Sequence, residues 1–491
     1  MRKDVLLAWT ALCLLSRLSL AASGGAAGPV AAGDTLLLSG KVLDKQTGRP
    51  VAYAAIGIRG KAIGTITNEE GRFDFYLPGG RRSDTVFVTC LGYVGFEATV
   101  GSLPAKNLAI ALEPATYTLR EAVVKGRKGL TAEQIVRKAR QKITDNYPVT
   151  PYKLEAYYRK YQKVNGRYVY FTDAALEVYD QGYQRGPGAG PGHREQVVLR
   201  ETRQSHYQDP KPYENALDRE KRYLNSIDNC LFRNAVRYRN ESLQTGHYTY
   251  RLDSVVRQDT STFYLITARI KHHKYMRWHQ QDNTRKPAYQ LYIHTGTFAI
   301  HRIEYAPEPM RVDCFKDAQH LMAVAGNDSI RSYLLGSEAR ISVEFKSFRG
   351  VLFPHYILIY LKFNDYNVPQ GKERFTNEYQ DELLVNNIHT EGVQAPDPAR
   401  VMQRDKSLES QLGTYNPQFW KRYNAIKLAP LDERLITQLE AGLTLEEQFR
   451  KRTRMHLSKI DAKLYRTQYY EKKPGTWIPG EGWARWGFAF K

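Results

Sequence analysis

Short apolar runs, broken by turn residues, dominate the chain from Leu36 to Leu112. Within these runs apolar positions alternate with polar ones, so that Phe73 and Phe75 share one face of a strand. Strands at this spacing, with Gly and Pro at the breaks, are typical of an all-β sandwich. The pattern therefore predicts a β-sandwich of about seven strands over residues 36–124.

Longer alternating runs follow between Tyr152 and Val385, and they indicate a second, larger antiparallel sheet. A capping box formed by Thr131 and Gln134 precedes them and opens a stretch with apolar positions at helical spacing. We expect one amphipathic helix at about 131–145 leading into the sheet. The fold class predicted for residues 130–390 is thus mainly β, with a half-barrel-like antiparallel sheet behind a leading helix.

Tyrosine is concentrated in this second region, since 24 of the 34 tyrosines lie within residues 150–385. Tyrosine suits a half-buried pleated surface because its ring is apolar and its hydroxyl is polar. One interpretation is ordinary packing between neighbouring strands. The other is a concave aromatic face that holds a lipid or a glycan.

The pattern changes again after a Pro-containing break at 394–398. Pro417 stands at a position typical of a helix start, and Thr444 and Glu447 form a second capping box. The chain then ends in a Gly-rich stretch that carries five aromatic residues, among them Trp477 and Trp486. We therefore predict a helical and aromatic C-terminal extension over residues 398–491, packed on the sheet.

The N-terminal segment has the layout of a Sec signal peptide over residues 1–22. A basic start is followed by a short apolar run, which Arg17 interrupts, and then by small residues. The alternative is an uncleaved anchor. No later stretch approaches the length of a membrane-spanning helix, so we expect no transmembrane helix after signal cleavage. Export would place the chain in the periplasm or at the outer-membrane surface. Whether Cys90, Cys230 and Cys314 form a bridge stays open.

A series of short motifs runs through residues 39–124. These motifs are Ser39-Gly40-Lys41-Val42, Asp44, Thr47-Gly48-Arg49-Pro50-Val51, Ala55-Ile56-Gly57-Ile58, Gly64-Thr65-Ile66-Thr67-Asn68, Glu70-Gly71-Arg72-Phe73, Leu91-Gly92-Tyr93, Leu112-Glu113-Pro114 and Leu119-Arg120-Glu121-Ala122-Val123-Val124. With them, residues 39–124 closely resemble the carboxypeptidase-regulatory-like (transthyretin-like) domain. The resemblance implies a non-catalytic β-sandwich of the kind that often precedes outer-membrane nutrient receptors in Gram-negative envelopes.

The run at 288–305 weakly resembles the half-barrel sheets of lipoprotein-carrier and envelope lipid-carrier proteins, in which a helix also leads into long hairpins. Residues 131–363 are similar to regions that follow the same sandwich in uncharacterised envelope proteins. These resemblances imply an envelope context and supply no chemistry.

A basic excess gives the chain a formal net charge of +21, which favours an anionic partner or serves solubility. Its densest stretch, residues 271–286, carries five Lys or Arg and one Asp. It could bind the phosphates of an anionic envelope lipid or a glycan, or it could be a solvated hairpin loop. No nucleic-acid motif occurs, and we expect no nucleic-acid partner. The candidate ligand-binding residues are Lys271, His272, His273, Lys274, Arg277 and Trp278.

A short motif typical of zinc hydrolases, His-x-x-Glu, occurs at His301 and Glu304, with His389 as a candidate third ligand. The motif lies in a predicted strand, where positions three apart point to opposite faces, so zinc binding would need a bulge or a loop. The sequence contains no G-x-S-x-G, H-E-x-x-H, Walker A or dinucleotide fingerprint.

These patterns favour a non-enzymatic, exported envelope protein with a binding or assembly role. Its partner would be an anionic envelope lipid or glycan, or another envelope protein, and no cofactor is predicted. The alternative is a hydrolase, resembling a metal-dependent peptidase, with its site in the sheet at 150–390. Catalytic Ser/His/Asp sets that assemble only in space stay open, because sequence spacing does not reveal them.

Overall fold

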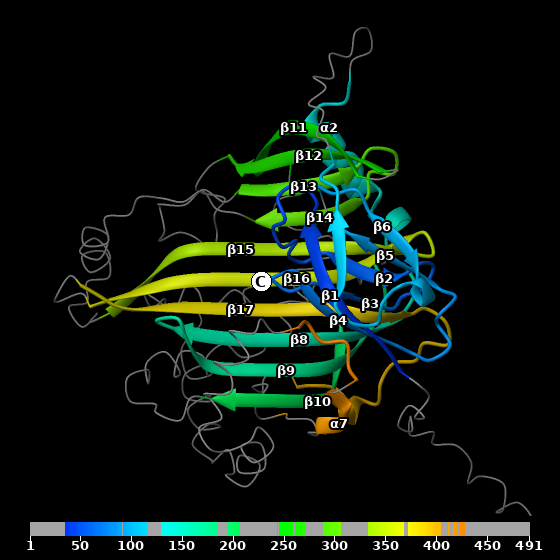
Figure 1. The fold of residues 1–491 in the computed structure, drawn as a ribbon. Coiled ribbons are helices and arrows are strands. Elements are labelled where there is room, and N and C mark those ends of the chain that lie inside the picture. The colour runs from blue at the N-terminus through cyan, green and yellow to red at the C-terminus, as the bar shows by residue number, and fades with distance from the viewer. Residues whose placement is uncertain are drawn as a thin grey trace, which may run out of the picture.

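The structure is a computed structural model, and its fold is mainly β (Figure 1). Among the described residues, no helix combines the length and apolar content needed to cross a membrane. The described residues are 35–90, 92–115, 129–183, 195–206, 243, 245–258, 261–271, 288–305, 332–367, 372–403, 411, 416–420 and 422–427.

Two small sheets form the predicted N-terminal sandwich. One has the order β4-β1-β7, in which β1 and β7 run parallel, and the other has the order β3-β2-β5-β6. Their facing side chains form one apolar cluster in which Val42, Phe75 and Val88 are fully buried. The seven strands are β1 (Leu36–Asp44), β2 (Ala55–Ile58), β3 (Gly64–Ile66), β4 (Arg72–Leu77), β5 (Thr85–Thr89), β6 (Phe96–Thr99) and β7 (Leu108–Leu112), and a 3-10 turn, η1 (Val100–Ser102), lies between β6 and β7.

The predicted leading helix is present as α2 (Ala132–Gln141). Its capping box is confirmed, since the Thr131 hydroxyl accepts from the Gln134 amide and the Gln134 side chain accepts from the Thr131 amide. The helix stops earlier than predicted, at Lys142, and a separate turn of helix, α3 (Ile143–Asn146), follows. The apolar face of α2 is buried against the large sheet.

Ten antiparallel strands form the large sheet, in the order β10-β9-β8-β17-β16-β15-β14-β13-β12-β11. Each strand pairs with a long neighbour, and β8 lies beside β17 although more than two hundred residues separate them in sequence. The strands are β8 (Tyr152–Val164), β9 (Arg167–Asp180), β10 (Gln196–His206), β11 (Tyr248–Gln258), β12 (Ser261–Ile270), β13 (Ala288–His294), β14 (Ile300–Tyr305), β15 (Ser332–Phe348), β16 (Val351–Asn367) and β17 (Lys372–His389).

The two edges of this sheet differ in how they are protected from further strand pairing. At the β10 edge, Val198 forms a bridge with Val401, and the Met402 amide donates to the Val197 carbonyl at 2.8 Å. The β11 edge is irregular between Leu252 and Ser254 and carries charged side chains there. Bulges and charges are usual devices against edge-to-edge aggregation.

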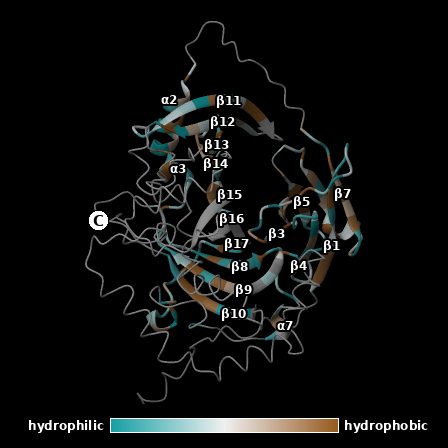
Figure 2. Cartoon of the chain, turned by 90° about the vertical axis from the view of Figure 1, so that its left-hand side faces the viewer, coloured by the Kyte–Doolittle hydropathy of each residue, from teal (hydrophilic) through white to brown (hydrophobic). Residues whose placement is uncertain are grey.

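Different elements cover the two faces of the ten-stranded sheet (Figure 2). On one side α2 and α3 pack over it, and this helix-facing side carries the larger apolar cluster. On the other side lies the sandwich, where Ile66 joins Tyr157, Tyr356 and Leu384 in a second cluster. Both faces are therefore buried over part of their length, as expected for a sheet between two layers.

The C-terminal extension is described only in part. A 3-10 turn, η5 (Pro398–Arg400), covers the β10 edge region, and the short helix α7 (Pro417–Trp420) begins at Pro417 as predicted. The chain from 422 to 427 then runs without regular structure. The second capping box, the aromatic end and the signal-like residues 1–22 lie outside the described residues.

Candidate functional site

The helix-facing side of the large sheet changes from apolar to polar along its strands. Two neighbouring rows of side chains across β17, β8 and β9 are apolar, and the next two are polar. Tyr158 stands at the transition, where its hydroxyl donates to Asp381 at 2.7 Å. The apolar rows are Val385–Ala156–Leu176 and Leu383–Tyr158–Ala174, and the polar rows are Asp381–Lys160–Thr172 and Tyr379–Gln162.

The polar rows hold a buried, charge-balanced group of side chains. Lys160 is 5% exposed and Thr172 is fully buried, while Asp381 lies directly opposite Lys160 on the neighbouring strand. Burial raises the pKa of Asp381, and the nearby Lys160 ammonium partly offsets this. Gln162 donates to the Tyr379 hydroxyl at 3.0 Å. We call these five residues (Lys160, Gln162, Thr172, Tyr379 and Asp381) the polar rows below.

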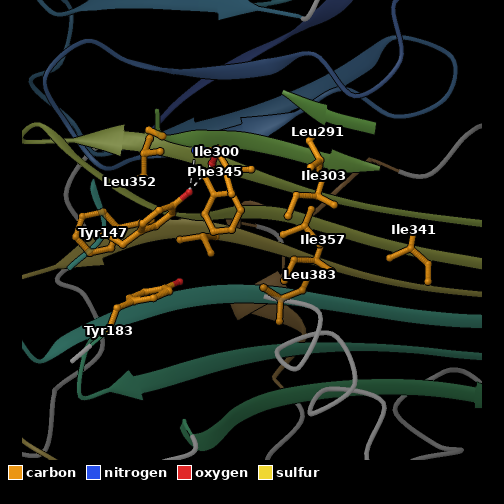
Figure 3. Packing of buried hydrophobic residues seen from close by; sticks show 14 of the residues in the cluster. Tyr147, Tyr183, Leu291, Ile300, Ile303, Ile341, Phe345, Leu352, Ile357 and Leu383 are labelled. Atoms are coloured by element: carbon orange, nitrogen blue, oxygen red, sulfur yellow. Dashed lines mark hydrogen bonds between the residues drawn. The ribbon is translucent and has the colours of Figure 1, made fainter. Parts of the chain in front are cut away.

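At the apolar end of the same side, an aromatic group gathers around Tyr147 (Figure 3). The Tyr147 hydroxyl donates to the Ile300 carbonyl at 2.6 Å and accepts from the Ile300 amide at 3.1 Å. Its ring meets Tyr183 at 5.2 Å and Phe345 at 5.3 Å between ring centroids. These contacts fix the segment after α3 to β14.

The opposite, sandwich-facing side carries a row of alternating charges across four strands. Directly opposite positions on neighbouring strands hold opposite charges: Glu382 on β17, Arg159 on β8, Asp173 on β9 and Arg203 on β10. Asp173 is fully buried and accepts from Arg159 Nε at 3.1 Å, from Arg203 Nε at 2.6 Å and from the Tyr157 hydroxyl at 2.5 Å. Opposite charges at directly opposite positions stabilise strand pairing. This charge row therefore fixes the register at one end of the sheet.

The tyrosines of the sheet serve packing and hydrogen bonding to carboxylates. Tyr152, Tyr157 and Tyr356 are almost fully buried. Their hydroxyls donate to Asp180 at 2.9 Å, Asp173 at 2.5 Å and Glu382 at 2.7 Å respectively. Tyr356 also stacks on Tyr53 of the sandwich, with ring centroids 5.6 Å apart. These tyrosines thus follow the packing interpretation of the sequence.

A C-terminal segment, residues 416–420 and 422–427 and here called the strap, joins the sandwich to the sheet. The side-chain amide of Asn424 accepts from the Tyr76 amide at 2.7 Å and donates to the Tyr76 carbonyl at 3.0 Å. It thereby bonds the free edge of β4 as a neighbouring strand would. On the sheet side, Arg159 donates to the Ile426 carbonyl at 2.5 Å and Asn386 donates to the Asn424 carbonyl at 2.8 Å.

Replacing Asn424 by Ala should loosen the sandwich from the sheet. The change leaves the amide and carbonyl of Tyr76 without their partner, and we expect a loss of about 1–2 kcal/mol. The check is hydrogen exchange at the Tyr76 amide together with the urea midpoint. Asn416→Ala is the matched control in the strap, since the Asn416 side chain accepts from the Gln418 amide within the strap and does not touch β4. Equal exchange at Tyr76 in both variants would show that Asn424 does not hold this edge.

The residues of the metal alternative lie apart and have other partners. His301 is the extra residue at a bulge in β14, so the bulge that zinc binding would need is present. However, its ring packs on Phe263 at 5.0 Å, and Glu304 forms an ion pair with Arg302. His389 is on β17, beyond the intervening strands β15 and β16, and bonds Glu155 at 3.0 Å. Within the described part of the chain, no three His, Cys, Asp or Glu side chains gather to hold a metal.

Only the first residue of the predicted basic site is described. Lys271 follows β12, its amide donates to the His247 carbonyl at 2.8 Å, and its ammonium donates to the Thr245 carbonyl at 3.0 Å. The root of the basic stretch is thus tied to the chain before β11. His272, His273, Lys274, Arg277 and Trp278 lie outside the described residues. Cys90 is a partly exposed cysteine at the end of the sandwich strand β5, whereas Cys230 and Cys314 lie outside the described residues.

Comparison with known proteins confirms the resemblance of the first domain. Residues 38–124 match the CarboxypepD_reg-like domain family. No curated relative matches the chain. Among solved structures, the chain is similar to a DUF1329 family protein from Desulfovibrio piger, with 8% identity, a TM-score of 0.24, and coverage of 54% of this chain and 93% of that one. It is also similar to a LolA superfamily protein from Nitrosomonas europaea, with 11% identity, a TM-score of 0.21, and coverage of 56% and 99%.

Proposed function

We propose that this chain is an exported, non-catalytic envelope protein that binds an amphiphilic lipid on the helix-facing side of its large sheet. The observation that carries the proposal is the change from apolar rows to polar rows along β17, β8 and β9. An acyl chain gains free energy by leaving water for an apolar surface, whereas its head group needs hydrogen-bond partners. Apolar and polar side chains therefore follow one another here in the order that such a ligand requires.

The polar rows set the kind of head group that fits. Lys160 offers hydrogen-bond donors, and Thr172 and Gln162 offer both donors and acceptors. Because Asp381 balances the charge of Lys160, the group is close to neutral as a whole. A zwitterionic or polyhydroxylated head group suits it better than a bare phosphate. The basic stretch from Lys271 would then attract anionic membrane surfaces rather than select the ligand.

The helix α2 does not cover the apolar rows. It packs mainly beside β11, at the other end of the strand order from β8 and β9. Ile135, Val136 and Ala139 of α2 belong to the same extended apolar cluster as Leu176 and Leu383. An acyl chain on the apolar rows therefore does not need to displace α2.

Replacing Lys160 by Met should weaken lipid binding about tenfold, which corresponds to about 1.4 kcal/mol. The measurement is titration with a fluorescently labelled zwitterionic lysophospholipid. Lys163→Met on the same strand is the matched control, because residue 163 lies three positions away and its ammonium packs over the Tyr161 and Tyr168 rings. Equal affinity of both variants would contradict a head-group role for Lys160.

A second variant separates loss of binding from loss of folding. Lys160→Met alone leaves Asp381 without its counter-charge, which can destabilise the fold. The double variant Lys160→Met, Asp381→Leu removes the whole pair, so it should fold and still bind lipid weakly. Wild-type affinity in the folded double variant would exclude the polar rows as the head-group site.

The same preparation tests the hydrolase alternative. Stoichiometric zinc that is lost in a His301→Ala variant, or turnover of a peptide or ester substrate abolished by one substitution, would favour a metal-dependent enzyme. We expect lipid to co-purify with the protein instead.

A further inference from the structure

A lysine of the large sheet enters a notch in the sandwich. Gly57 on β2 and Gly64 on β3 pair directly across these strands, and Phe87 on β5 pairs with Gly57 from the other side. A methyl group built on Gly57 or Gly64 would lie 3.0 Å or 3.2 Å from the Lys346 Nζ. The two glycines therefore leave a flat gap in the sandwich surface, and the Lys346 ammonium lies over it.

Lys346 has unusual surroundings for a lysine. Its Nζ lies 5.2 Å from the centroid of the Phe87 ring, which is a cation–π distance. The structure shows no hydrogen bond or ion pair of this ammonium with any described residue. Burial alone lowers the pKa of Lys346 to about 8. Lys346 is partly buried, and a partly buried ammonium without a carboxylate is costly, whereas the neutral amine is tolerated much better.

Other charged groups near this notch do not supply the missing counter-charge. His355 on β16 is buried, its Nε2 has no hydrogen-bond partner, and Lys346 contributes to lowering its pKa. On the sandwich, Arg59 lies over the same Phe87 ring at 5.2 Å and is paired with Glu97. The strands β2 and β3 present glycine here and add no charge. All the neighbours that act on Lys346 are thus neutral, positive or already paired.

We propose that Lys346 is a latch between the two domains, which holds the sandwich closed on the sheet in its neutral form and loosens it when protonated. This conformational device does not depend on the lipid proposal, because it involves the opposite side of the sheet. It also gives a reason for glycine at positions 57 and 64, since any larger residue would fill the notch.

The sign of the pH dependence follows from the lowered pKa. The closed junction favours the neutral amine, so Lys346 adds its full stability to the junction only above the pKa of an exposed lysine, about 10.5. That contribution is lost as the pH falls from about 10.5 to about 8, and it does not return at lower pH.

Two substitutions test the latch in the full chain. Lys346→Met keeps length and removes the charge, so its urea midpoint relative to wild type should rise as the pH falls from 10 to 8. Lys346→Arg carries a permanent charge on a larger group, and its midpoint should lie below wild type throughout this range. An unchanged difference between wild type and Lys346→Met at pH 10 and pH 8 would overturn the proposal.

Chemical labelling gives a second readout that does not depend on unfolding. Competitive acetylation followed by mass spectrometry compares Lys346 with Lys45, whose side chain is 59% exposed. At pH 9.5, where the latch is closed, we expect Lys346 to react at least about tenfold more slowly than Lys45. After correction for the neutral fraction of each amine, the rate of Lys346 divided by that of Lys45 should rise as the pH falls to 7.5. Labelling of Lys346 at the rate of Lys45 at both pH values would also overturn the proposal.

Discussion

Replacing Asp173 by Ala should cost about 3–5 kcal/mol of unfolding free energy, because it leaves a buried guanidinium without its carboxylate. Arg159 is 4% exposed by its side chain and bonds Asp173 at 3.1 Å, and Arg203 and the Tyr157 hydroxyl bond the same carboxylate. The loss would spread along the charge row, since Arg159 also donates to the Ile426 carbonyl of the strap.

Urea unfolding followed by circular dichroism measures this effect, with Asp145→Ala as the control. Asp145 forms an ion pair with Lys142 at the surface, and its side chain is 54% exposed. We expect its removal to change stability by less than about 1 kcal/mol. A similarly small effect for Asp173→Ala would mean that the charge row does not stabilise the sheet.

The second large effect is a loss of stability in acid that is tied to two histidines, the buried His355 and the partly buried His301. Burial, together with the nearby His294, lowers the pKa of His301 to about 4. Burial, together with Lys346, lowers the pKa of His355 to about 3. Both side chains are therefore neutral in the folded protein at pH values where they would be charged in the unfolded chain.

The direction follows from linkage between proton binding and folding. Each neutral histidine adds its full contribution above the unfolded pKa of about 6.5, and that contribution is lost as the pH falls toward the folded value. At about 1.4 kcal/mol per pKa unit, His301 alone accounts for about 3 kcal/mol between pH 6.5 and pH 4.

Gln variants isolate this contribution from that of the many carboxylates. The stability of His301→Gln and His355→Gln, relative to wild type, should rise as the pH falls from 7 to 4, because Gln gains no proton. The measurement is the urea midpoint at each pH. A difference that stays constant over this range would show that neither histidine is held neutral by the fold.

Much of the fold could be predicted because local sequence patterns determine its elements. Alternation such as Phe73 and Phe75 is visible in a short window, and so is the capping box at Thr131. The sandwich and the leading helix were predicted from such windows. The early end of α2 at Lys142 was missed, because Ile143 continues the helical spacing that α3 then uses separately.

The candidate sites depend on the register between strands that are distant in sequence, and local sequence patterns do not reveal that register. Glu382 and Arg159 become neighbours only because β17 pairs with β8, and a shift of one residue would place them on opposite faces. Lys346 meets Gly57 only where the sandwich packs on the large sheet. The one available signal was charged residues, such as Arg159 and Asp173, at positions inside apolar strands. That signal marks a buried pair and does not tell which pair forms.

The metal alternative shows the same limit of sequence reasoning, because strand order decides whether its residues can meet. Strand periodicity argues against zinc binding by the His-x-x-Glu motif at His301 unless a bulge intervenes, and the structure places a bulge there. What separates the three residues is the order of the strands, since β15 and β16 lie between His301 and His389. Sequence spacing carries no information on that order.

Native mass spectrometry of the gently purified protein tests the central claim most directly. The account predicts a lipid bound in a one-to-one complex, retained in Lys163→Met and largely lost in the folded Lys160→Met, Asp381→Leu variant. A protein that carries no lipid and takes up none from mixed phospholipid micelles would contradict it.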